Sequence, residues 1–259
     1  MSSSLEEVRL KDAVALRSVS KVFSSGRDPV VALDRIDLVV PRGRFTCLVG
    51  ASGCGKSTLL NLVAGLDRAS SGHIEVSGRT SLMFQEAALF PWLTLERNVA
   101  LAISLRGDGT SRSAARSEAQ DLLDLVQLGD FARRRPHEVS GGMRQRAALA
   151  RALAQRPEIL LMDEPFGALD AITRDLLHEE LEQIWQAQQM TVLFVTHNVR
   201  EAVRLGDEVL VLSSRPGRVV ETISVDVARP RRIESKEVAE IASSVSERLR
   251  SEVRRHGQH

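Results

Sequence analysis

Hydrophobic residues along the chain gather in short continuous runs that alternate with longer amphipathic stretches. Four of the runs are strand-sized and almost wholly apolar: RFTCLVG (44–50), EILLMDEP (158–165), TVLFVTH (191–197) and EVLVLSS (208–214). Continuous apolar runs of this length are typical of strands buried on both faces of a parallel sheet. Their alternation with helical patterns predicts an α/β fold in which helices cover both faces of the sheet.

The rest of the pattern divides into an N-terminal strand region and a helical region. The stretches AVALRSV (13–19), VVALDRIDLVV (30–40), GHIEVSG (72–78) and TSLMFQ (80–85) predict strands. From residue 86 to about residue 156 the pattern is helical, with a polar loop at RGDGTSRSAARS (106–117). We expect this region to be a helical insert of roughly 70 residues in the sheet domain. TRDLLHEELEQIWQAQQ (173–189) and NVREAVRLG (198–206) predict two more helices.

The tail from residue 229 begins with the basic stretch RPRR (229–232) and continues with apolar residues at mostly helical spacing. This spacing predicts a C-terminal helix packed on the body of the protein. We expect the RPRR stretch to be solvated surface, with a lipid-headgroup contact as the alternative. We expect the RGD tripeptide at 106–108 to be a simple polar loop.

Composition narrows the class of protein further. The 259 residues are 43% hydrophobic and 27% charged, with a net charge of +1, so no basic surface is expected for nucleic acid. Cys47 and Cys54 do not form a disulfide framework, which fits a reducing compartment. The first residues do not resemble a signal peptide, and no apolar run approaches the ~20 residues of a membrane span. We therefore expect any membrane association to come through a partner.

A phosphate-binding loop follows the strand that ends near residue 49. GASGCGKS (50–57) fits the P-loop pattern, and a helix follows it as the pattern requires. Glycines let successive backbone N–H groups converge on an anion, toward which the positive end of the next helix also points. Lys56 is expected to contact the β- and γ-phosphates, and the Ser57 hydroxyl to bind Mg²⁺. The predicted nucleotide-binding residues are Gly50, Ala51, Ser52, Gly53, Cys54, Gly55, Lys56, Ser57 and Thr58.

A second part of the predicted site lies at the end of the buried run ILLMDEP (159–165). Ligands of open α/β sheets bind at the carboxyl ends of the strands, which is where Asp163 and Glu164 lie. Asp163 can hold Mg²⁺, and Glu164 can orient and deprotonate an attacking water. An acidic turn after a strand is common by itself, so the P-loop is what makes this interpretation specific.

These motifs, in this order, resemble those of the ATP-binding cassette (ABC) ATPases. The resemblance rests on the P-loop, VSGGMRQRAALARAL (139–153), ILLMDEP, GALD (167–170) and TVLFVTH, and it covers residues 14–220. It implies a mixed-sheet RecA-like core with an N-terminal antiparallel β-subdomain. It also implies one cassette over residues 1–228, with core segments 1–85 and 157–228, a helical subdomain at 86–156 and an extension at 229–259.

In this family two cassettes pair head to tail, and each signature helix points at the nucleotide held by the other subunit. Ser140, Gly141 and Gly142 match the signature motif. The resemblance implies that Ser140 is both N-cap and phosphate contact, and that neither glycine tolerates a side chain. It therefore implies a second cassette, expected as a homodimer formed on ATP binding.

The resemblance assigns four further positions. Gln85 matches the Q-loop glutamine that senses Mg²⁺ and the γ-phosphate, and Asp170 matches the D-loop aspartate at the dimer interface. His197 matches the switch histidine that hydrogen-bonds the γ-phosphate. Phe23 stands at the adenine-stacking position, although a core phenylalanine is the alternative. The implied catalytic residues are thus Glu164, His197 and Gln85, and the implied Mg²⁺ ligands are Ser57, Gln85 and Asp163.

Several segments resemble the subgroup that energises importers of nitrate, taurine and alkanesulfonates: FQEAALFPWLTLERNVALAI (84–103), DEPFGALDAITRDLLHEELEQIW (163–185) and LSSRPGRVVE (212–221). In that subgroup the region of Phe90, Pro91, Trp92 and Leu93 meets a permease, although a buried apolar turn is the alternative here. Two features depart from the subgroup: a shorter loop before Gln85, and Asn198 in place of aspartate. Met143 stands where many cassettes have glutamine, although this subgroup often carries methionine.

We therefore expect the ATP-hydrolysing subunit of an importer of a small anion. The expected partners are a second cassette, separate permease chains and, indirectly, an external solute-binding protein, at the cytoplasmic face of a bacterial inner membrane. The alternatives are a soluble cassette ATPase of repair, translation or cofactor assembly, and an importer cassette for another solute. An exporter cassette is a closer rival than a P-loop kinase or GTPase, because the latter two lack the signature helix.

Overall fold

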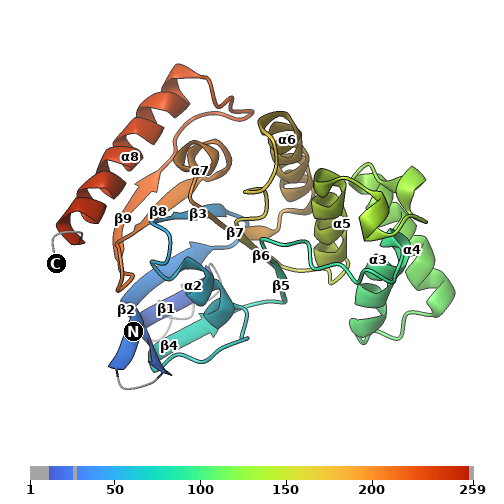
Figure 1. Ribbon diagram of the computed structural model, residues 1–259, viewed down its shortest axis with the longest axis horizontal. Coiled ribbons are helices and arrows are strands. Elements are labelled where there is room, and N and C mark those ends of the chain that lie inside the picture. Colours follow the sequence, from blue (N-terminus) through green and yellow to red (C-terminus); the bar gives the residue numbers. More distant parts are fainter. Residues whose placement is uncertain (1–11, 26–27, 257–259) are drawn as a thin grey trace, which may run out of the picture. The chain divides into compact units, whose positions relative to one another are not determined.

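The computed structural model describes residues 12–25 and 28–256, and Figure 1 labels their helices and strands. These residues divide into two compact units. The first unit comprises the described residues up to Gly78 and from Gln189 onward, and the second is Arg79–Gln188. The subdomain boundaries expected near residues 86 and 156 do not coincide with this division and stay a prediction. The predicted absence of a signal peptide concerns the first residues of the chain, which lie almost entirely outside the described residues.

An antiparallel sheet forms one layer of the first unit. It consists of β1 (Asp12–Ser25), β2 (Asp28–Pro41) and β4 (Ser71–Val76), in the order β2-β1-β4. The register places Val14 opposite Val40 on one side and opposite Val76 on the other. Alternating β-branched residues favour such half-buried strands, and the predicted antiparallel N-terminal part of the fold is confirmed.

A second group of strands in this unit is largely parallel. It consists of β3 (Phe45–Val49), β7 (Thr191–Thr196), β8 (Glu208–Leu212) and β9 (Val219–Ser224), in the order β7-β3-β8-β9. β3 is parallel to both neighbours, and β9 is antiparallel to β8. Every residue of β3 and β7 is buried, which agrees with their continuous apolar sequences. The strand β9 is not among the predicted strands.

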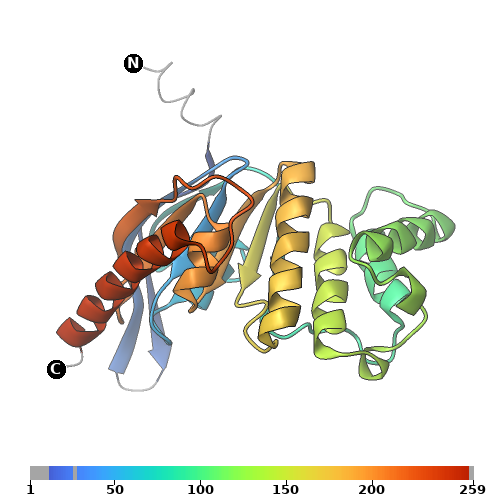
Figure 2. The same cartoon turned by 90° about the horizontal axis from the view of Figure 1, so that it is seen from above.

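The described part of the first unit also contains the helices α2 (Lys56–Val63), α7 (Val199–Leu205) and α8 (Lys236–His256). α7 packs on β3, β7 and β8, and α8 packs on α7 and β8 (Figures 1 and 2). α8 buries Val238, Ala242 and Val245, which are spaced along one helical face. The predicted C-terminal helix packed on the body is confirmed.

The basic stretch before α8 is only partly the solvated surface that we expected: Pro230 and Arg232 are exposed, but the other two residues are not. Arg231 is only 5% exposed, and its guanidinium donates to the carbonyl oxygens of Val203, Gly206, Val225 and Val227. Arg229 is also largely buried: it donates to the carbonyl of Leu205 and pairs with Asp207 at 2.9 Å. The unsatisfied carbonyls at the C-terminal end of α7 attract these cations, which explains the difference.

The second unit contains one strand pair and most of the helices. β5 (Thr80–Met83) is parallel to β6 (Ile159–Asp163), and the long helices are α3 (Leu95–Leu105), α4 (Arg112–Leu125), α5 (Gly141–Leu153) and α6 (Ala171–Gln188). Two single 3₁₀ turns, η1 (Gly129–Phe131) and η2 (Pro136–Glu138), connect α4 to α5. The helical character expected for this region is confirmed from residue 95 onward, whereas residues 84–94 form turns and extended backbone.

The expected polar loop at residues 106–117 is partly wrong. α4 already begins at Arg112, capped by the Ser111 hydroxyl, which accepts from the Ala114 N–H at 3.3 Å. The Arg106 side chain is 2% exposed and donates to both Glu118 carboxylate oxygens, at 2.7 and 3.0 Å. The arginine of the RGD tripeptide is therefore a buried structural anchor of the helices.

In the described part of the chain, no helix has both the length and the apolar character needed to cross a bilayer.

Candidate nucleotide site

The P-loop curls around the ammonium group of its own lysine. Lys56 is 5% exposed, and its Nζ donates to the carbonyl oxygens of Gly50 and Ala51, at 3.1 Å each. Gly55 is the N-cap of α2 and has φ +106°, a backbone conformation that L side chains rarely adopt. A Cβ at Gly55 would also lie 2.7 Å from Leu33 Cδ2 and 2.9 Å from the Ala32 carbonyl oxygen. Only glycine fits this position.

The first turn of α2 has the electrostatic character of an anion site. It contains no acidic residue, its N-cap has no side-chain hydrogen bond, and Ser57 is exposed there. The positive end of the helix dipole and the backbone N–H groups of this turn therefore favour a phosphate group. Cys54 is 1% exposed and fills space inside the loop, in line with the expectation of a small packing side chain.

His197 lies beside the start of the P-loop because their two strands are neighbours. Val49, the last residue of β3, is opposite Thr196, the last residue of β7, so Gly50 and His197 leave the same sheet edge. His197 is exposed, and Asn198 caps α7: its Oδ1 accepts from the N–H groups of Arg200 and Glu201, at 3.1 and 3.4 Å. Asparagine thus performs the capping that aspartate would perform at this position.

In the second unit, Gln85, Asp163 and Glu164 also lie at or just after the ends of neighbouring parallel strands, β5 and β6. Met83 at the end of β5 is opposite Met162 in β6, so the residues that follow both strands emerge at one edge. Asp163 and Glu164 are half-buried, and Glu164 has φ +45°, which is unusual for a residue with a side chain. Backbone in such sparsely populated regions is concentrated at functional sites.

Ser140 begins helix α5 as predicted. Its hydroxyl oxygen accepts from the Met143 N–H at 3.3 Å, and its carbonyl accepts from the Arg144 N–H at 3.0 Å. The two glycines that follow differ in their surroundings. A Cβ at Gly142 would lie 2.6 Å from Thr173 Cγ2, whereas at Gly141 the nearest atoms are 3.8 Å away. Packing within the chain therefore explains Gly142, and the space at Gly141 is open within this unit.

Asp170 is the capping residue of α6. Its carboxylate accepts from the Thr173 N–H at 3.0 Å and from the Thr173 hydroxyl at 2.7 Å. These hydrogen bonds hold the Asp170 pKa below its ordinary value. The side chain is exposed and ionised, so it remains available to a neighbouring molecule.

Gln85 begins a segment that is tied to helix α5 by two side chains. Gln145 Nε2 donates to the Gln85 carbonyl at 2.7 Å, and Arg151 donates to the carbonyls of Ala87 and Ala88, at 2.8 and 2.6 Å. Gln145 is 6% exposed, and burial lowers the pKa of Arg151 from its ordinary value. Neither residue is predicted from the sequence; the only signal is a polar residue on the buried face of α5.

Phe23 is not a core residue. It lies near the end of β1, 40% exposed, with the Lys21 ammonium 4.8 Å from the centre of its ring. This exposure removes the core alternative and leaves adenine stacking as a prediction.

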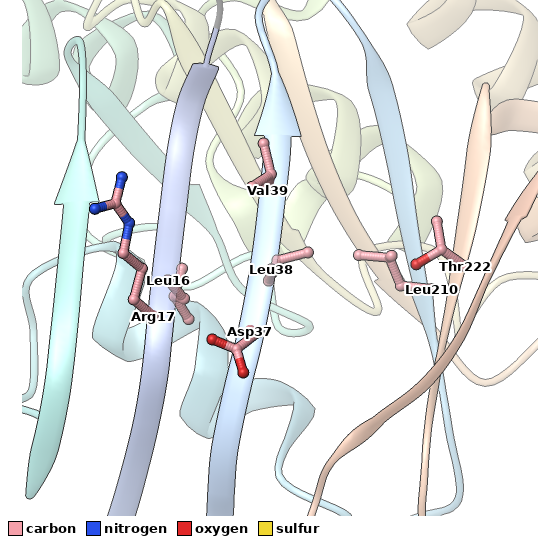
Figure 3. Close-up of a pocket in the computed structure, with 7 residues that line it drawn as sticks. All are labelled: Leu16, Arg17, Asp37, Leu38, Val39, Leu210 and Thr222. Carbon is pink, nitrogen blue, oxygen red and sulfur yellow. The ribbon is translucent and has the colours of Figure 1, made fainter. Parts of the chain in front are cut away.

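A cavity of about 480 Å³ lies elsewhere in the first unit, between β1–β2 and β8–β9 (Figure 3). Leu38 and Leu210 point toward each other across it, and none of the predicted site residues lines it. It plays no part in the nucleotide site.

The donor groups of the site suit a magnesium ion bound together with a nucleotide. A serine hydroxyl, a glutamine amide oxygen and a carboxylate are hard oxygen donors of the kind that Mg²⁺ prefers. Within the described ranges no three His, Cys, Asp or Glu residues cluster into a metal cage. Mg²⁺ usually takes one or two protein ligands and completes its shell with phosphates and water.

A strand, a P-loop and an anion-binding helix N-terminus are typical of P-loop nucleotide-binding proteins, and comparisons with known proteins identify the family. The ABC transporter family model matches residues 33–167. An aliphatic sulfonates import ATP-binding protein of Mesorhizobium japonicum is 48% identical over 92% of this chain and 88% of its own length. A nitrate import ATP-binding protein of Synechocystis is 45% identical over 82% of each chain.

The fold agrees with a solved cassette. The dimeric ATP-binding cassette MJ0796, in a post-hydrolysis state bound to ADP and Pi, matches with a TM-score of 0.76 and 30% identity, over 83% of this chain and 100% of that one. The chain belongs to the ATP-binding proteins of ABC transporters, within their nitrate, taurine and sulfonate importer subgroup. It is an ATPase that uses ATP with Mg²⁺.

Proposed function

We propose that this ATPase works as a homodimer that drives import of a small oxyanion through separate permease subunits. The sulfonate and nitrate relatives support the solute class, because both solutes are small oxyanions. The observation that carries the proposal is an apolar groove in the second unit, at the region expected to meet a permease.

The groove lies between the segment at Phe90 and the helices α3 and α5. It is a cavity of about 240 Å³ whose lining includes Leu82, Phe90, Leu101 and Leu105. Leu105 is 74% exposed, and beside the groove Trp92 is 67% exposed, with its ring centre 5.5 Å from that of Phe90. Large apolar side chains exposed around a groove suit a docked helix. They also exclude the alternative of a buried apolar turn.

A fully buried asparagine shapes the rim of the groove. Asn98 is 0% exposed, its Oδ1 accepts from the Phe90 N–H at 2.7 Å, and its Nδ2 donates to the Phe90 and Thr94 carbonyls, at 3.2 and 3.0 Å. Hydrogen bonds to Asn98 therefore fix the turn that carries Phe90 and Trp92 to α3. A surface organised in this way is preordered for a partner, which reduces the entropy lost on docking.

The proposed chemistry uses the residues in the following roles. Glu164 accepts a proton from the attacking water, whose oxygen bonds to the γ-phosphorus as the bond to the leaving ADP oxygen breaks. Lys56 and the N-terminus of α2 bind the phosphates, and His197 donates a hydrogen bond to the γ-phosphate. Ser57, Asp163 and Gln85 would hold Mg²⁺, which neutralises developing charge when bound.

The second cassette completes the proposed site. The open space at Gly141 and the positive N-terminal end of α5 suit a phosphate held by the partner's P-loop. Asp170, exposed and ionised, suits a contact across the same interface. Closure of the two cassettes around ATP would turn the permease outward, and hydrolysis would reset it.

We further propose that the subunit lies at the cytoplasmic face of a bacterial inner membrane and receives its solute through an external solute-binding protein. The importer names of the relatives support this location. Solute specificity would belong to the partner proteins, so this chain would contribute only the ATP-dependent step.

The test is purification of the tagged chain with its membrane partner from the cells that make it. Trp92→Asp should lose the partner, because a charge would be buried against an apolar helix. Phe131→Asp is the matched control, since Phe131 is also exposed, at 42%, but lies outside the groove. MgATP binding by each isolated variant checks its folding.

Two results would contradict the proposal. The solute class would be wrong if the ATPase rate of the wild-type complex, measured with the solute-binding protein, did not respond to sulfonates, taurine or nitrate. Co-purification of Trp92→Asp at the wild-type level would contradict the docking surface.

A further inference from the structure

The turn between β8 and β9, with the sequence SSRPGR (213–218), packs directly on the P-loop, and the proposed mechanism assigns it no role. Both segments belong to the first unit. The turn touches the P-loop through two residues, Arg215 and Gly217.

Arg215 fixes one peptide group of the P-loop. Its Nε and Nη2 donate to the Gly53 carbonyl oxygen, at 3.3 and 3.2 Å. The N–H at the other end of the same peptide group, that of Cys54, donates to the Ala51 carbonyl at 3.3 Å. With both ends held, the peptide plane between Gly53 and Cys54 cannot rotate without breaking a hydrogen bond.

Gly217 supports the next peptide group by close packing. A Cβ at Gly217 would lie 2.3 Å from the Cys54 carbonyl oxygen and 3.1 Å from Leu33 Cδ2. The Gly217 N–H donates to the Ala32 carbonyl at 2.9 Å, and its carbonyl accepts from the Asp34 N–H at 3.0 Å. Gly217 therefore fills the space between β2 and the P-loop, and no larger residue fits.

The turn itself is firmly held, so it can act as a support. The Ser213 hydroxyl donates to the Pro216 carbonyl at 2.9 Å and accepts from the Arg218 N–H at 2.9 Å. Ser213 is 3% exposed, and the Arg218 guanidinium pairs with Asp34 of β2. Contacts to β2 on one side and to the P-loop on the other make the turn a bridge between them.

We propose that Arg215 and Gly217 are positioning residues that hold the P-loop peptide groups at Gly53–Gly55 in the orientation that binds the nucleotide phosphates. The proposal rests on ATP binding by the P-loop and is independent of the transported solute. A preordered set of N–H donors binds an anion more tightly, because less conformational entropy is lost on binding. Loss of either contact should therefore weaken nucleotide affinity in a chain that remains folded.

The experiment measures the Kd of the full-length chain for a fluorescent ATP analogue with Mg²⁺, together with the melting temperature. Arg215→Ala should weaken binding on the order of tenfold, as expected for loss of a charge-assisted hydrogen bond. Arg215→Lys, which keeps one donor, should recover part of the affinity. Gly217→Ala should weaken binding more strongly, because its methyl group would displace the Cys54 carbonyl.

Arg248→Ala is the matched control, because it removes an exposed guanidinium that pairs with Glu221 at 3.1 Å in the same unit and does not touch the P-loop. Its Kd should equal that of the wild type. If Gly217→Ala does not fold, the comparison of Arg215→Ala with Arg215→Lys decides the outcome. The proposal would be overturned if Arg215→Ala bound the ATP analogue with the wild-type Kd, whether or not its melting temperature fell. The role of the turn would then be purely structural. Absence of nucleotide binding by the wild type would instead contradict ATP binding itself.

Discussion

The P-loop of the first unit and the segment 84–94 of the second unit each carry predicted nucleotide-site residues, and they are held in place by different means. The P-loop is fixed by main-chain packing, with glycines at Gly55 and Gly217 where a Cβ has no room. The segment 84–94 is fixed by long side chains: Gln145 and Arg151 of α5 and Asn98 of α3 bond to its backbone. The phosphate cradle therefore stays rigid within the first unit, while the segment that carries Gln85 follows the helices of the second.

This difference has a mechanical meaning. The helix that ties down Gln85 and Ala88 is the one that begins at Ser140. A displacement of α5 thus carries both the Gln85 segment and the Ser140 terminus with it. Binding should depend on the first unit, and turnover on the helices of the second. The following changes test that separation, from the largest expected effect to the smallest.

Glu164→Gln should separate binding from turnover most completely. The amide cannot accept a proton from water, so ATP hydrolysis should fall by at least ~100-fold. MgATP binding should persist because the P-loop is unchanged, and the ATP-bound dimer should accumulate. Phosphate release and size-exclusion chromatography with ATP measure the two properties. A monomer that still hydrolyses ATP would contradict the mechanism.

Gly141→Ala and Gly142→Ala should behave differently despite being adjacent. The chain has room for a methyl group at Gly141, so the melting temperature should not fall, yet hydrolysis should fall roughly tenfold or more because a partner's phosphate is obstructed. Gly142→Ala should instead cost about 1–3 kcal/mol of stability against Thr173. Adding Thr173→Ser removes the clashing methyl and should restore that stability. Full activity of Gly141→Ala would show that no phosphate approaches there.

Arg151→Met should release the Gln85 segment while leaving the P-loop intact. Two carbonyls would lose their donor, at a cost of about 1–3 kcal/mol. We expect faster amide hydrogen exchange over residues 84–94 and a lower hydrolysis rate at unchanged MgATP affinity. The control is Arg156→Met, because that arginine is 63% exposed and pairs with Glu118. A fall in nucleotide affinity for Arg151→Met would contradict the separation of the two regions.

The smallest effect concerns acid stability near Arg106. Hydrogen bonds from the Thr110 hydroxyl and N–H, with the charge of Arg106, lower the pKa of Asp108 from 3.8 to about 2. A depressed pKa stabilises the folded state above pH 3.8, and this stabilisation is lost as the pH falls toward 2. Thr110→Val should raise the pKa of Asp108 and move acid unfolding to higher pH, measured by circular dichroism. An unchanged acid midpoint would contradict this assignment.

The sequence pattern predicts the strands and helices that are wholly apolar or strongly periodic. β3, β6 and β7 follow from continuous apolar runs, and Asp163 and His197 follow from the ends of those strands. β9 is missed because VVETIS is a half-exposed edge strand, with alternate residues exposed, beside a Gly-containing turn. Its alternation is a usable signal that the neighbouring motif obscures.

The hydrogen bonds of buried polar side chains could not be predicted, because they depend on which polar groups the fold buries. Arg106, Arg229 and Arg231 look like surface charges in a sequence, yet each satisfies carbonyl or carboxylate groups that the folded backbone leaves unpaired. Asn98 and Gln145 likewise resemble ordinary helix-surface residues until the helices pack. Residue type and spacing predict chemistry at strand ends, but which polar side chains become buried is decided by tertiary packing.

The burial of Arg231 limits how far the chain can be shortened at its C-terminal end. A chain shortened to residue 228 would keep every predicted catalytic residue and still leave the carbonyls of Val203 and Gly206 without this donor. It would also uncover the surface that α8 protects on α7, the helix that starts two residues after His197. Expression designs and fusions should therefore retain the whole of α8, because its apolar face covers part of the core and Arg231 satisfies buried carbonyls.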